Sequence, residues 1–521
     1  MNKTYKNLFT VVLTLILVTS CKKVVEKPDV AVKQPNIIFI MTDDHATQAI
    51  SSYGSTINKT PEIDKLAAQG IQFNNAFVTN AICGPSRAVI LSGRHSHLNG
   101  MIDNHTRFDS TQVTFPKILR KNGYETAIVG KWHLESEPTG FDYWNILPGQ
   151  GDYYNPDFIK NGKETIYNGY VTNVTTDIAL NWLSNRKSDK PFMLMVHQKA
   201  PHRNWMPDLD DLDKYEDVEF PKPATFNDDY KGKEHLKDQK LTIAKHMDIS
   251  FDLKIPCDTC WRDPVNDWGL EHSKKKLGRL NAEQKAKWDA GYKTEIQEFF
   301  ASKFTEERTD WNFERYIQDY LRCIVSVDES VGRINKYIED NGLAENTIII
   351  YTSDQGFFLG EHGLFDKRYM YEESLKTPMI IKYPKKIKAG ITSNQLVQNL
   401  DIAPTILNAA GVSIPESFQG ESLFPLFENT ESSAWRQEIY YEFFESGWGV
   451  PKHHGIRTRD YKLIYINPYD SNPESWELYN LNADPNEMNN LSAQAEYKNV
   501  VEEMKSKLKN LRKKYKVNNN K

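Results

Sequence analysis

Short apolar runs rich in β-branched residues recur along the chain, and each is followed by polar side chains. Residues 36–41 read NIIFIM and residues 347–351 read TIIIY, with similar runs at residues 125–129 and 191–196. Runs of this kind are typical of parallel strands that are buried on both faces. The pattern therefore predicts an α/β fold with a large, mostly parallel central sheet flanked by helices.

The pattern changes near Gly420. Short runs of aromatic and β-branched residues then predict an antiparallel sheet, with strands at residues 438–444, 455–459, 461–465 and 477–479. A basic helix follows at about residues 497–514, and its Lys and Arg side chains are expected to form a solvated face. We expect a catalytic domain over residues 35–418 and a smaller C-terminal subdomain, which contains this sheet, over residues 419–521.

A long segment of the expected catalytic domain, residues 204–312, is dense in charge and in aromatic residues. Its Trp residues are Trp205, Trp261, Trp268, Trp288 and Trp311. Long insertions at a catalytic face commonly build the substrate pocket, and indole faces suit the apolar side of sugar rings. Solvated helices with aromatic anchors are the alternative for any one Trp.

Apolar residues then recur at helical spacing from Ile317 to Ile338, which predicts a helix with Cys323 in the core.

The amino terminus has the pattern of a targeting segment. Lys3 and Lys6 precede an apolar run at residues 8–18, and Val18-Thr19-Ser20-Cys21 resembles a bacterial lipobox. A transmembrane anchor is the alternative, but the run is too short for an ordinary span. We expect a lipoprotein signal peptide at residues 1–20 and a linker at residues 21–34. The protein would then be a bacterial lipoprotein, periplasmic or at the cell surface, tethered to the membrane through lipid on Cys21.

Length and charge narrow the class of protein. The chain has 521 residues, of which 39% are hydrophobic, so it can bury a large core. The net charge of −5 argues against a general nucleic-acid binder. An anionic substrate would have to be attracted by positive charge that is gathered locally.

Carboxylates stand directly after two of the predicted strands. Asp43 and Asp44 follow the first strand, and Asp354 and Gln355 follow the strand at residues 347–351. Adjacent carboxylates after a buried strand repel each other unless a cation lies between them. Three carboxylates and an amide oxygen suit Ca²⁺ or Mg²⁺ better than Zn²⁺. A helix N-cap is the alternative for an Asp after either strand alone.

The segment Cys83-Gly84-Pro85-Ser86-Arg87 places a nucleophile on a turn that opens a predicted helix. The first N–H groups of a helix are unsatisfied and attract an anion, and the guanidinium of Arg87 adds a positive charge. An inert, buried Cys before a helix is the alternative.

Other basic side chains also follow predicted strands. Lys131 and His133 come after residues 125–129, and His202 comes after residues 191–196, while Lys367 lies beyond Asp354. In an open α/β sheet the ligand crevice lies outside the carboxyl ends of the strands, so these side chains would converge. Two Lys, an Arg and at least two His around a metal and a nucleophile indicate a site for a tetrahedral oxyanion.

The pattern C-x-P-S-R followed by Leu91-Ser92-Gly93 resembles the signature of the sulfatase family, a branch of the alkaline phosphatase superfamily. Nearly all of the mature chain is similar to family blocks in the family's order, most like bacterial polysaccharide or N-acetylglucosamine-6-sulfatase-like members. These blocks are PNIIFIMTDDH, CGPSRAVILSG, GKWHL, KAPH, SDQGFFLGEHGLFDKRYMYEESLKTPMI and WELYNLNADPNEMNNL.

The resemblance implies a cofactor set and roles for individual residues. Cys83 would be converted to formylglycine by a formylglycine-generating enzyme. The expected ligands of Ca²⁺, or of Mg²⁺ in its place, are Asp43, Asp44, Asp354, Gln355 and the modified Cys83. The expected polar catalytic shell is Arg87, Lys131, His133, His202 and Lys367.

Two positions depart from the family pattern. Gln355 stands where Asn or His is more usual, and it keeps an amide oxygen for the metal. Glu135 follows Leu134 where many members have Gly, so the rim of the pocket and the choice of substrate are in question.

The resemblance also implies a reaction, in which the hydrated aldehyde of formylglycine attacks the sulfur of a sulfate ester. His202, or else Lys367, would protonate the leaving oxygen, and His133 would act as the base. We expect a sulfated carbohydrate as substrate, either an algal polysaccharide such as ulvan or a glycosaminoglycan-type oligosaccharide. The alternatives are a formylglycine-dependent phosphodiesterase or phosphonate hydrolase, and a lipoprotein that binds sulfated glycan without turnover.

Candidate sugar contacts lie outside this shell. They are Trp205, His362, His453 and Arg457.

The segment Cys257-Asp258-Thr259-Cys260 favours a local disulfide in an oxidising compartment. A zinc site is the alternative, with His246 and His272 as further ligands.

Overall fold

The computed structural model describes residues 34–257, 268–301, 308–467 and 475–517. The chain from Gln34 onward forms one compact unit, so the expected domain boundary at residue 418 stays a prediction. The expected signal peptide, its alternative as an anchor and, apart from Gln34, the linker lie outside the described residues. None of the described helices is both long enough and apolar enough to cross a membrane.

The elements alternate between strands and helices along most of the chain. The strands are β1 Asn36–Thr42, β2 Ile71–Phe73, β3 Ala76–Phe77, β4 Glu125–Lys131, β5 Tyr143–Leu147, β6 Asp157–Lys160, β7 Lys163–Ile166, β8 Phe192–His197, β9 Thr347–Ser353, β10 Phe358–Leu359, β11 Phe365–Asp366, β12 Met379–Lys382, β13 Ile391–Ser393, β14 Val397–Gln398, β15 Glu438–Phe443, β16 His453–Thr458, β17 Tyr461–Ile466 and β18 Ser475–Asn480. The helices are α1 Pro61–Ala68, α2 Cys83–Ser92, α3 Ser96–Asn99, α4 Phe115–Lys121, α5 Val171–Asn185, α6 Trp268–Leu277, α7 Ala282–Gly291, α8 Lys293–Ala301, α9 Arg308–Asp340, α10 Glu372–Leu375, α11 Ile402–Ala409, α12 Phe424–Glu428 and α13 Lys498–Lys514.

The main sheet confirms the predicted α/β class. Its strand order is β13-β2-β12-β9-β1-β8-β4-β5-β6-β7. The central strands β9, β1, β8, β4 and β5 pair in parallel, while β12 and β6 join them antiparallel. The sheet is therefore mixed, with its parallel part in the middle, where both faces are covered and apolar residues occupy consecutive positions.

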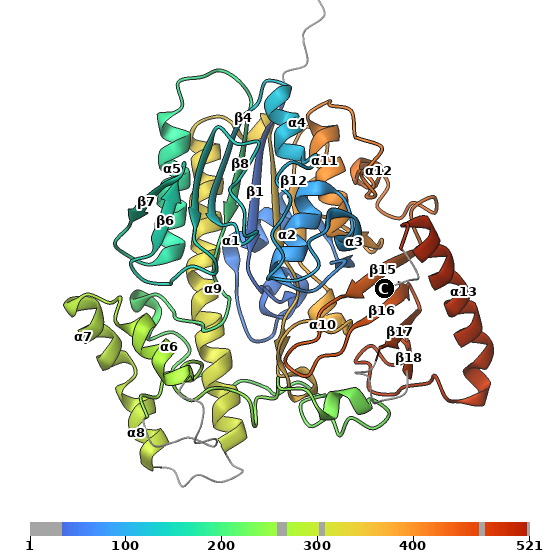
Figure 1. Ribbon diagram of the computed structural model, residues 1–521. Coiled ribbons are helices and arrows are strands. Elements are labelled where there is room, and N and C mark those ends of the chain that lie inside the picture. Colours follow the sequence, from blue (N-terminus) through green and yellow to red (C-terminus); the bar gives the residue numbers. More distant parts are fainter. Residues whose placement is uncertain (1–33, 258–267, 302–307, 468–474, 518–521) are drawn as a thin grey trace, which may run out of the picture. The chain divides into compact units, whose positions relative to one another are not determined.

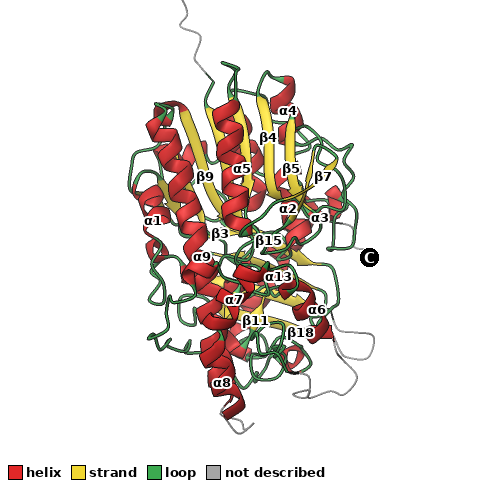
Figure 2. Cartoon of the chain, turned by 90° about the vertical axis from the view of Figure 1, so that its left-hand side faces the viewer, coloured by secondary structure: helices red, strands yellow, loops and turns green. Residues whose placement is uncertain are grey.

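Helices cover both faces of this sheet, as Figures 1 and 2 show. On one face α1, α5 and α9 pack against side chains such as Ile38, Val196 and Ile349. On the other face α2, α4 and α11 pack against Phe39 and Met195. Successive residues of one strand thus enter opposite cores, which explains the unbroken apolar runs in the sequence.

The C-terminal region forms a separate antiparallel sheet, as predicted, with the order β15-β16-β17-β18. α13 packs on one side of it through Met504 and Leu508, and Figure 1 shows this helix on the outer side of the sheet. On the other side, Ile439 and Tyr441 share a hydrophobic core with Phe77. This sheet is therefore packed directly against the catalytic part of the chain.

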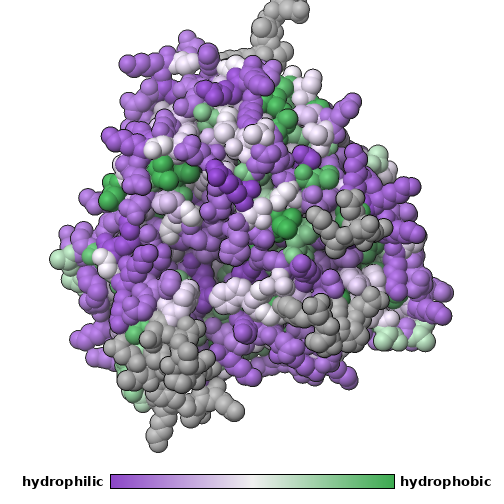
Figure 3. Space-filling view, in the orientation of Figure 1, coloured by the Kyte–Doolittle hydropathy of each residue, from purple (hydrophilic) through white to green (hydrophobic). Residues whose placement is uncertain are grey.

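The insertion differs in part from expectation. It contains α6, α7 and α8, but the helix expected around Ile317 begins at Arg308, within the residues assigned to the insertion. Trp205 and Trp288 are 0% and 3% exposed, respectively. These two residues therefore fit the alternative given above, in which a Trp of the insertion anchors a helix or loop to the core. Trp261 lies outside the described residues. The face of the molecule seen in Figure 3 is mostly hydrophilic.

Candidate active site

Three buried carboxylates gather at the carboxyl ends of two neighbouring strands. β1 and β9 pair in parallel, with Thr42 opposite Ser353, so Asp43 and Asp44 leave the sheet beside Asp354. One carboxylate oxygen from each of the three lies within 4.8 Å of the others. All three residues are 0% exposed. The strand-end rule thus brings together residues that are about 310 positions apart in the sequence.

Cys83 begins α2 directly beside this cluster. Its thiol Sγ lies 3.3 Å from Oδ1 of Asp43. Gly84 packs so tightly that an added Cβ would come within 2.5 Å of Met101 and 3.2 Å of the carbonyl oxygen of His133. Burial, together with the charge of Asp43, raises the pKa of the Cys83 thiol far above its usual range. As an unmodified thiol it is therefore protonated and a poor nucleophile.

Each carboxylate is in contact with a cation from a different element. Arg87, one turn into α2, donates to Oδ2 of Asp354 through Nε at 3.0 Å and Nη2 at 2.8 Å. Lys131, at the end of β4, contacts Asp43. Lys367 Nζ lies 2.7 Å from both carboxylate oxygens of Asp44. Three carboxylates and three cations balance, so a divalent cation would give the site a net positive charge that attracts an anion.

The carboxylates respond unequally to this crowding. Burial, together with the negative charge of Asp43, raises the pKa of Asp354 to about 7. Burial also raises the pKa of Asp44, in spite of the opposing charge of Lys367. Burial alone would raise the pKa of Asp43 as well, but Lys131, His202 and Arg87 together hold it well below its usual range. A pair of neighbouring acids with pKa values pushed apart is typical of a functional site.

The two expected catalytic histidines lie beside the cluster. Nε2 of His202 is 3.9 Å from Oδ2 of Asp44. Burial and the positive charge of Lys131 lower the pKa of both His202 and His133, so both are neutral at pH 7. Asp44 and His133 also have positive φ values of 71° and 54°. Such strained backbone is common in active sites.

Gln355 completes the oxygen set. Its amide Nε2 donates to Asp44 and lies 3.6 Å from Sγ of Cys83, while its buried Oε1 has no hydrogen-bond partner among the described residues. A hard divalent cation would coordinate this buried amide oxygen, which has no donor, and would relieve the repulsion among the three crowded carboxylates. The residues present therefore fit a bound Ca²⁺ or Mg²⁺.

Three further side chains border the site and had no role assigned from the sequence; two of them, His197 and Lys199, are buried, and Gln150 is half-buried. His197 ends β8, and its Nδ1 lies 3.0 Å from the carbonyl oxygen of Lys131. Gln150 Oε1 accepts from Nζ of Lys131 at 2.5 Å. Lys199 Nζ donates to the carbonyl oxygen of Gln150 at 3.0 Å, and burial lowers its pKa to about 7. The strand-end rule applies to His197, whereas nothing in the local sequence marks Gln150.

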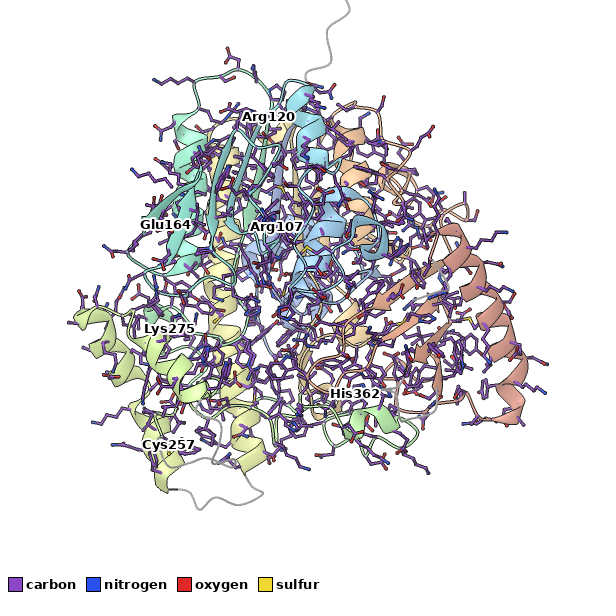
Figure 4. The ribbon with its side chains drawn as sticks, in the orientation of Figure 1. Arg107, Arg120, Glu164, Cys257, Lys275 and His362 are labelled. Atoms are coloured by element: carbon purple, nitrogen blue, oxygen red, sulfur yellow. The ribbon has the colours of Figure 1, made fainter. Side chains whose placement is uncertain are left out.

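The four expected sugar contacts occupy other positions. Trp205 is 0% exposed and packs on Tyr316, with ring centroids 4.6 Å apart. His362 is also buried, and its Nδ1 lies 2.6 Å from a carboxylate oxygen of Asp228. Figure 4 shows His362 in the lower part of the molecule.

The other two lie in the C-terminal sheet. His453 is the first residue of β16 and is 2% exposed. The strand was expected to start two residues later, with His453 on a loop, so this expectation was wrong. Arg457 forms an ion pair with Glu372 at 3.2 Å. All four side chains are thus engaged in packing or in contacts with other protein groups, and their contact with a sugar stays a prediction.

The remaining cysteines do not form a second metal centre within the described residues. Cys257 is disulfide-bonded, and Cys260 lies outside the described residues. His272 is half-buried on α6, where its Nδ1 lies 2.7 Å from the carbonyl oxygen of Trp268. Cys323 is free and buried in the core, as predicted.

Comparison with known proteins agrees with this geometry. The sequence profile of the sulfatase family matches residues 35–412. The profile described as N-sulphoglucosamine sulphohydrolase, C-terminal, matches residues 360–514. An N-acetylglucosamine-6-O-sulfatase of Bacteroides thetaiotaomicron is 46% identical over 496 residues, which is 93% of this chain and 88% of that protein. An ulvan-active sulfatase of Formosa agariphila is 27% identical, over 94% of this chain and 83% of that protein.

A solved structure extends the agreement to the whole fold. It is described as a complex with its substrate D-glucosamine-2-N,6-O-disulfate, and it matches this chain with a TM-score of 0.88 and 46% identity. The match covers 94% of this chain and 99% of that chain. The present chain belongs to the sulfatase family and is a sulfuric ester hydrolase.

Proposed function

We propose that the protein removes the 6-O-sulfate of N-acetylglucosamine or of a closely related glucosamine. The observation that carries the proposal is the 46% identity, over 93% of the chain, with a relative named N-acetylglucosamine-6-O-sulfatase. The solved structure at the same identity is described with a 6-O-sulfated glucosamine as its substrate. Ulvan is less well supported, because the ulvan-active relative is only 27% identical.

We further propose that Cys83 acts as formylglycine and that Asp43, Asp44, Asp354 and Gln355 hold a calcium ion. The high pKa of the thiol supports modification, since an unmodified Cys83 would be protonated. Formylglycine supplies a nucleophilic hydroxyl through its hydrate, and a divalent cation stabilises negative charge on sulfate oxygens. The crowded carboxylates and the unpartnered amide oxygen of Gln355 support the metal.

The surrounding side chains have complementary tasks. Arg87 fixes Asp354 through two hydrogen bonds. Lys131 and Lys367 reach the cluster from opposite elements, β4 and the loop after β11, where they can hold nonbridging sulfate oxygens. A bound sulfate ester would favour the protonated form of His202, which could then protonate the leaving oxygen; Lys367 is the alternative donor. His133 is the proposed base for release of sulfate.

The test is desulfation by protein that has been coexpressed with a formylglycine-generating enzyme. Sulfate release from N-acetylglucosamine 6-sulfate should exceed release from ulvan oligosaccharides and from 2-O-sulfated uronate by about 10² or more. Mass spectrometry of the peptide that contains Cys83 should show the aldehyde. Faster turnover of phosphate diesters or phosphonates would favour the alternative reaction, while unmodified Cys83 without any turnover would favour sugar binding alone.

Metal dependence is tested on the same preparation. Exhaustive chelation should abolish turnover and lower the melting temperature, and Ca²⁺ should restore both because it binds only the folded cluster. Full activity of metal-free protein would contradict the calcium site. Mg²⁺ and Ca²⁺ titrations would show which ion binds more tightly.

We also propose that the protein is a bacterial lipoprotein tethered through Cys21, on the strength of the lipobox alone. Metabolic labelling with a radioactive fatty acid should mark the wild type. A Cys21→Ser variant should lose the label and the membrane fraction. Equal labelling of both would contradict the anchor.

A further inference from the structure

Trp448 is an exposed aromatic residue with an unusual backbone. It is 42% exposed, and its φ of 58° lies in the left-handed region, which large side chains rarely adopt. The energetic cost of this backbone conformation is not offset by burial of the side chain in a core, because much of the indole faces solvent. Exposed, strained residues of this kind are concentrated at binding sites.

The loop that carries Trp448 is held in place by the insertion. The backbone N–H of Lys240 donates to the carbonyl oxygen of Trp448 at 2.7 Å. The next residue, Gly449, has a φ of 74°, and an added Cβ would lie 2.3 Å from the carbonyl oxygen of Asp238. Only glycine allows this close approach. The loop between β15 and β16 is therefore fixed against residues 238–240.

Two guanidinium groups lie against the Trp448 ring. The centre of the Arg203 guanidinium is 5.3 Å from the ring centroid, and that of Arg368 is 5.9 Å from it. Arg203 follows His202, and Arg368 follows Lys367. Since His202 and Lys367 both lie at Asp44, Trp448 is at the border of the sulfate site.

Each guanidinium is paired with a carboxylate. Arg203 donates to both oxygens of Asp252 at 2.7 and 2.6 Å, and Asp252 is only 1% exposed. Arg368 donates to Oε1 of Glu445 at 2.8 Å. The Glu445 side chain is 18% exposed and belongs to the same loop as Trp448. The accessible pair thus offers N–H donors and carboxylate acceptors next to an indole face.

A second exposed indole reaches the same place from the insertion. Trp268, the first residue of α6, is 41% exposed. Its ring centroid lies 6.0 Å from the Arg203 guanidinium. Exposed large hydrophobic side chains are few among the described residues, and two of them meet at this one group.

We propose that Trp448, Glu445 and Arg368 bind the sugar ring that carries the sulfate. The apolar face of the ring lies on the indole, and two neighbouring hydroxyls bridge Glu445 and Arg368, since hydroxyls both donate and accept. The inference rests on the proposed function, because the 6-O-sulfate must lie at Lys131 and Lys367 for the ring to reach this loop.

Charge identifies the kind of sugar. Arg203 and Asp252 are neutral as a pair, and Arg368 contacts two carboxylates, Glu445 at 2.8 Å and Asp366 at 3.4 Å. These two guanidinium groups therefore have no excess positive charge for a second sulfate or a uronate. An indole beside neutral donor and acceptor groups suits an uncharged pyranose. The proposal therefore favours N-acetylglucosamine 6-sulfate over a glucosamine that also carries a 2-N-sulfate.

The test uses Trp448→Ala, Trp448→Phe and Glu445→Gln in the metal-loaded, formylglycine-containing enzyme. The ratio of kcat/KM for N-acetylglucosamine 6-sulfate to kcat/KM for a small aryl sulfate should fall by about 10- to 100-fold for Trp448→Ala and Glu445→Gln, mainly through KM. Trp448→Phe keeps an aromatic face, so the ratio should fall by less than about 5-fold. A second readout is calorimetric binding of the sugar sulfate and of inorganic sulfate in a Cys83→Ala background. It should show the same selective loss for the sugar.

Matched controls lie on other segments of the chain. Phe300 on α8 is 52% exposed, and Glu431 pairs with Arg459 at 3.5 Å on the surface. Phe300→Ala and Glu431→Gln should leave the ratio unchanged within about twofold. Two outcomes would overturn the inference: equal losses on both substrates, or variants that keep the wild-type ratio and the wild-type affinity for the sugar. The proposed function would still stand if the wild type released sulfate from the sugar. A wild type that released sulfate from no sugar would overturn both.

Discussion

The active-site carboxylates and the carboxylate of Asp319 are both fully buried among cations, but the ratio of carboxylates to cations differs between the two clusters. At Asp319, on α9, one carboxylate contacts three cations, with Lys254 at 3.0 Å and both Arg315 and Arg322 at 3.2 Å. At the active site three carboxylates are crowded together within 4.8 Å. At Asp319 the three cations outnumber the nearby carboxylates even when Glu295, which pairs with Arg315 at 3.0 Å, is included. At the active site three cations face three carboxylates, which lie close enough to repel one another.

The pKa values show what this difference does. Burial alone would raise the pKa of Asp319, but Lys254, Arg315 and Arg322 outweigh burial and lower it. Burial and Asp43 raise the pKa of Asp354 to about 7. Burial of charge is therefore common to structural and functional clusters, whereas like charges held together beside a nucleophile mark the functional one.

The sharpest test of this distinction is Cys83→Ala. We expect kcat on any sulfate ester to fall by at least about 10⁴, because no neighbouring group offers another nucleophile. The melting temperature should change little, since the change removes only one sulfur atom. Cys83→Ser should be nearly as inactive. Activity within tenfold of the wild type, with matched circular dichroism, would contradict the role of Cys83.

Asp319→Asn should have the reverse profile. Removing this charge leaves Lys254, Arg315 and Arg322 buried without their common partner, which should lower the free energy of unfolding by about 3–5 kcal/mol. The kcat of the folded fraction should stay within about threefold of the wild type. Urea unfolding and active-site titration measure the two quantities. A large loss of kcat at unchanged stability would mean that Asp319 belongs to the chemistry.

Lys131→Ala and Lys367→Ala should reduce kcat by about 10² each on sugar and aryl sulfates alike, because both ammonium groups face the carboxylate cluster. The matched control is Lys382→Met. Lys382 is also buried, but it contacts Glu339 at 3.3 Å on another part of the sheet. It should affect stability and leave kcat within twofold. Equal kcat losses in all three variants would show that buried lysines act through the fold.

The fold and the carboxylate cluster could be predicted from the sequence because both follow from strand periodicity. The runs at residues 36–41 and 347–351 are buried on both faces, and residues that follow parallel strands must meet at one edge. This argument needs no side-chain detail. It applies equally to Asp43, to Asp354 and to His197, although no role was assigned to His197 from the sequence.

The rim of the site could not be predicted in the same way. Trp205, His453 and Arg457 were expected at a pocket wall, and in the structure all three are buried, with Arg457 in an ion pair. Residue type alone does not determine whether such a side chain faces the core or a pocket. Trp448 stands between two glycines, which is a turn signal in the sequence. Which distant loops meet over that turn depends on the packing of the C-terminal sheet against the insertion.

The smallest expected effect, and the finest test of the comparison, is the pH dependence of the Asp319 cluster. A carboxylate whose pKa is lowered by folding contributes stability that is present above its unfolded pKa, near 3.8, and is lost as pH falls through the lower folded value. Protonated Asp319 is uncharged like Asn, so the difference in unfolding free energy between the wild type and Asp319→Asn should narrow steadily below about pH 4. Other titrating groups, Asp354 among them, are common to both proteins and cancel in this difference. The measurement is urea unfolding of both proteins from pH 7 to pH 3. A difference that stays constant over this range would mean that the charge of Asp319 does not stabilise the folded protein, and the contrast between the two clusters would then lose its electrostatic basis.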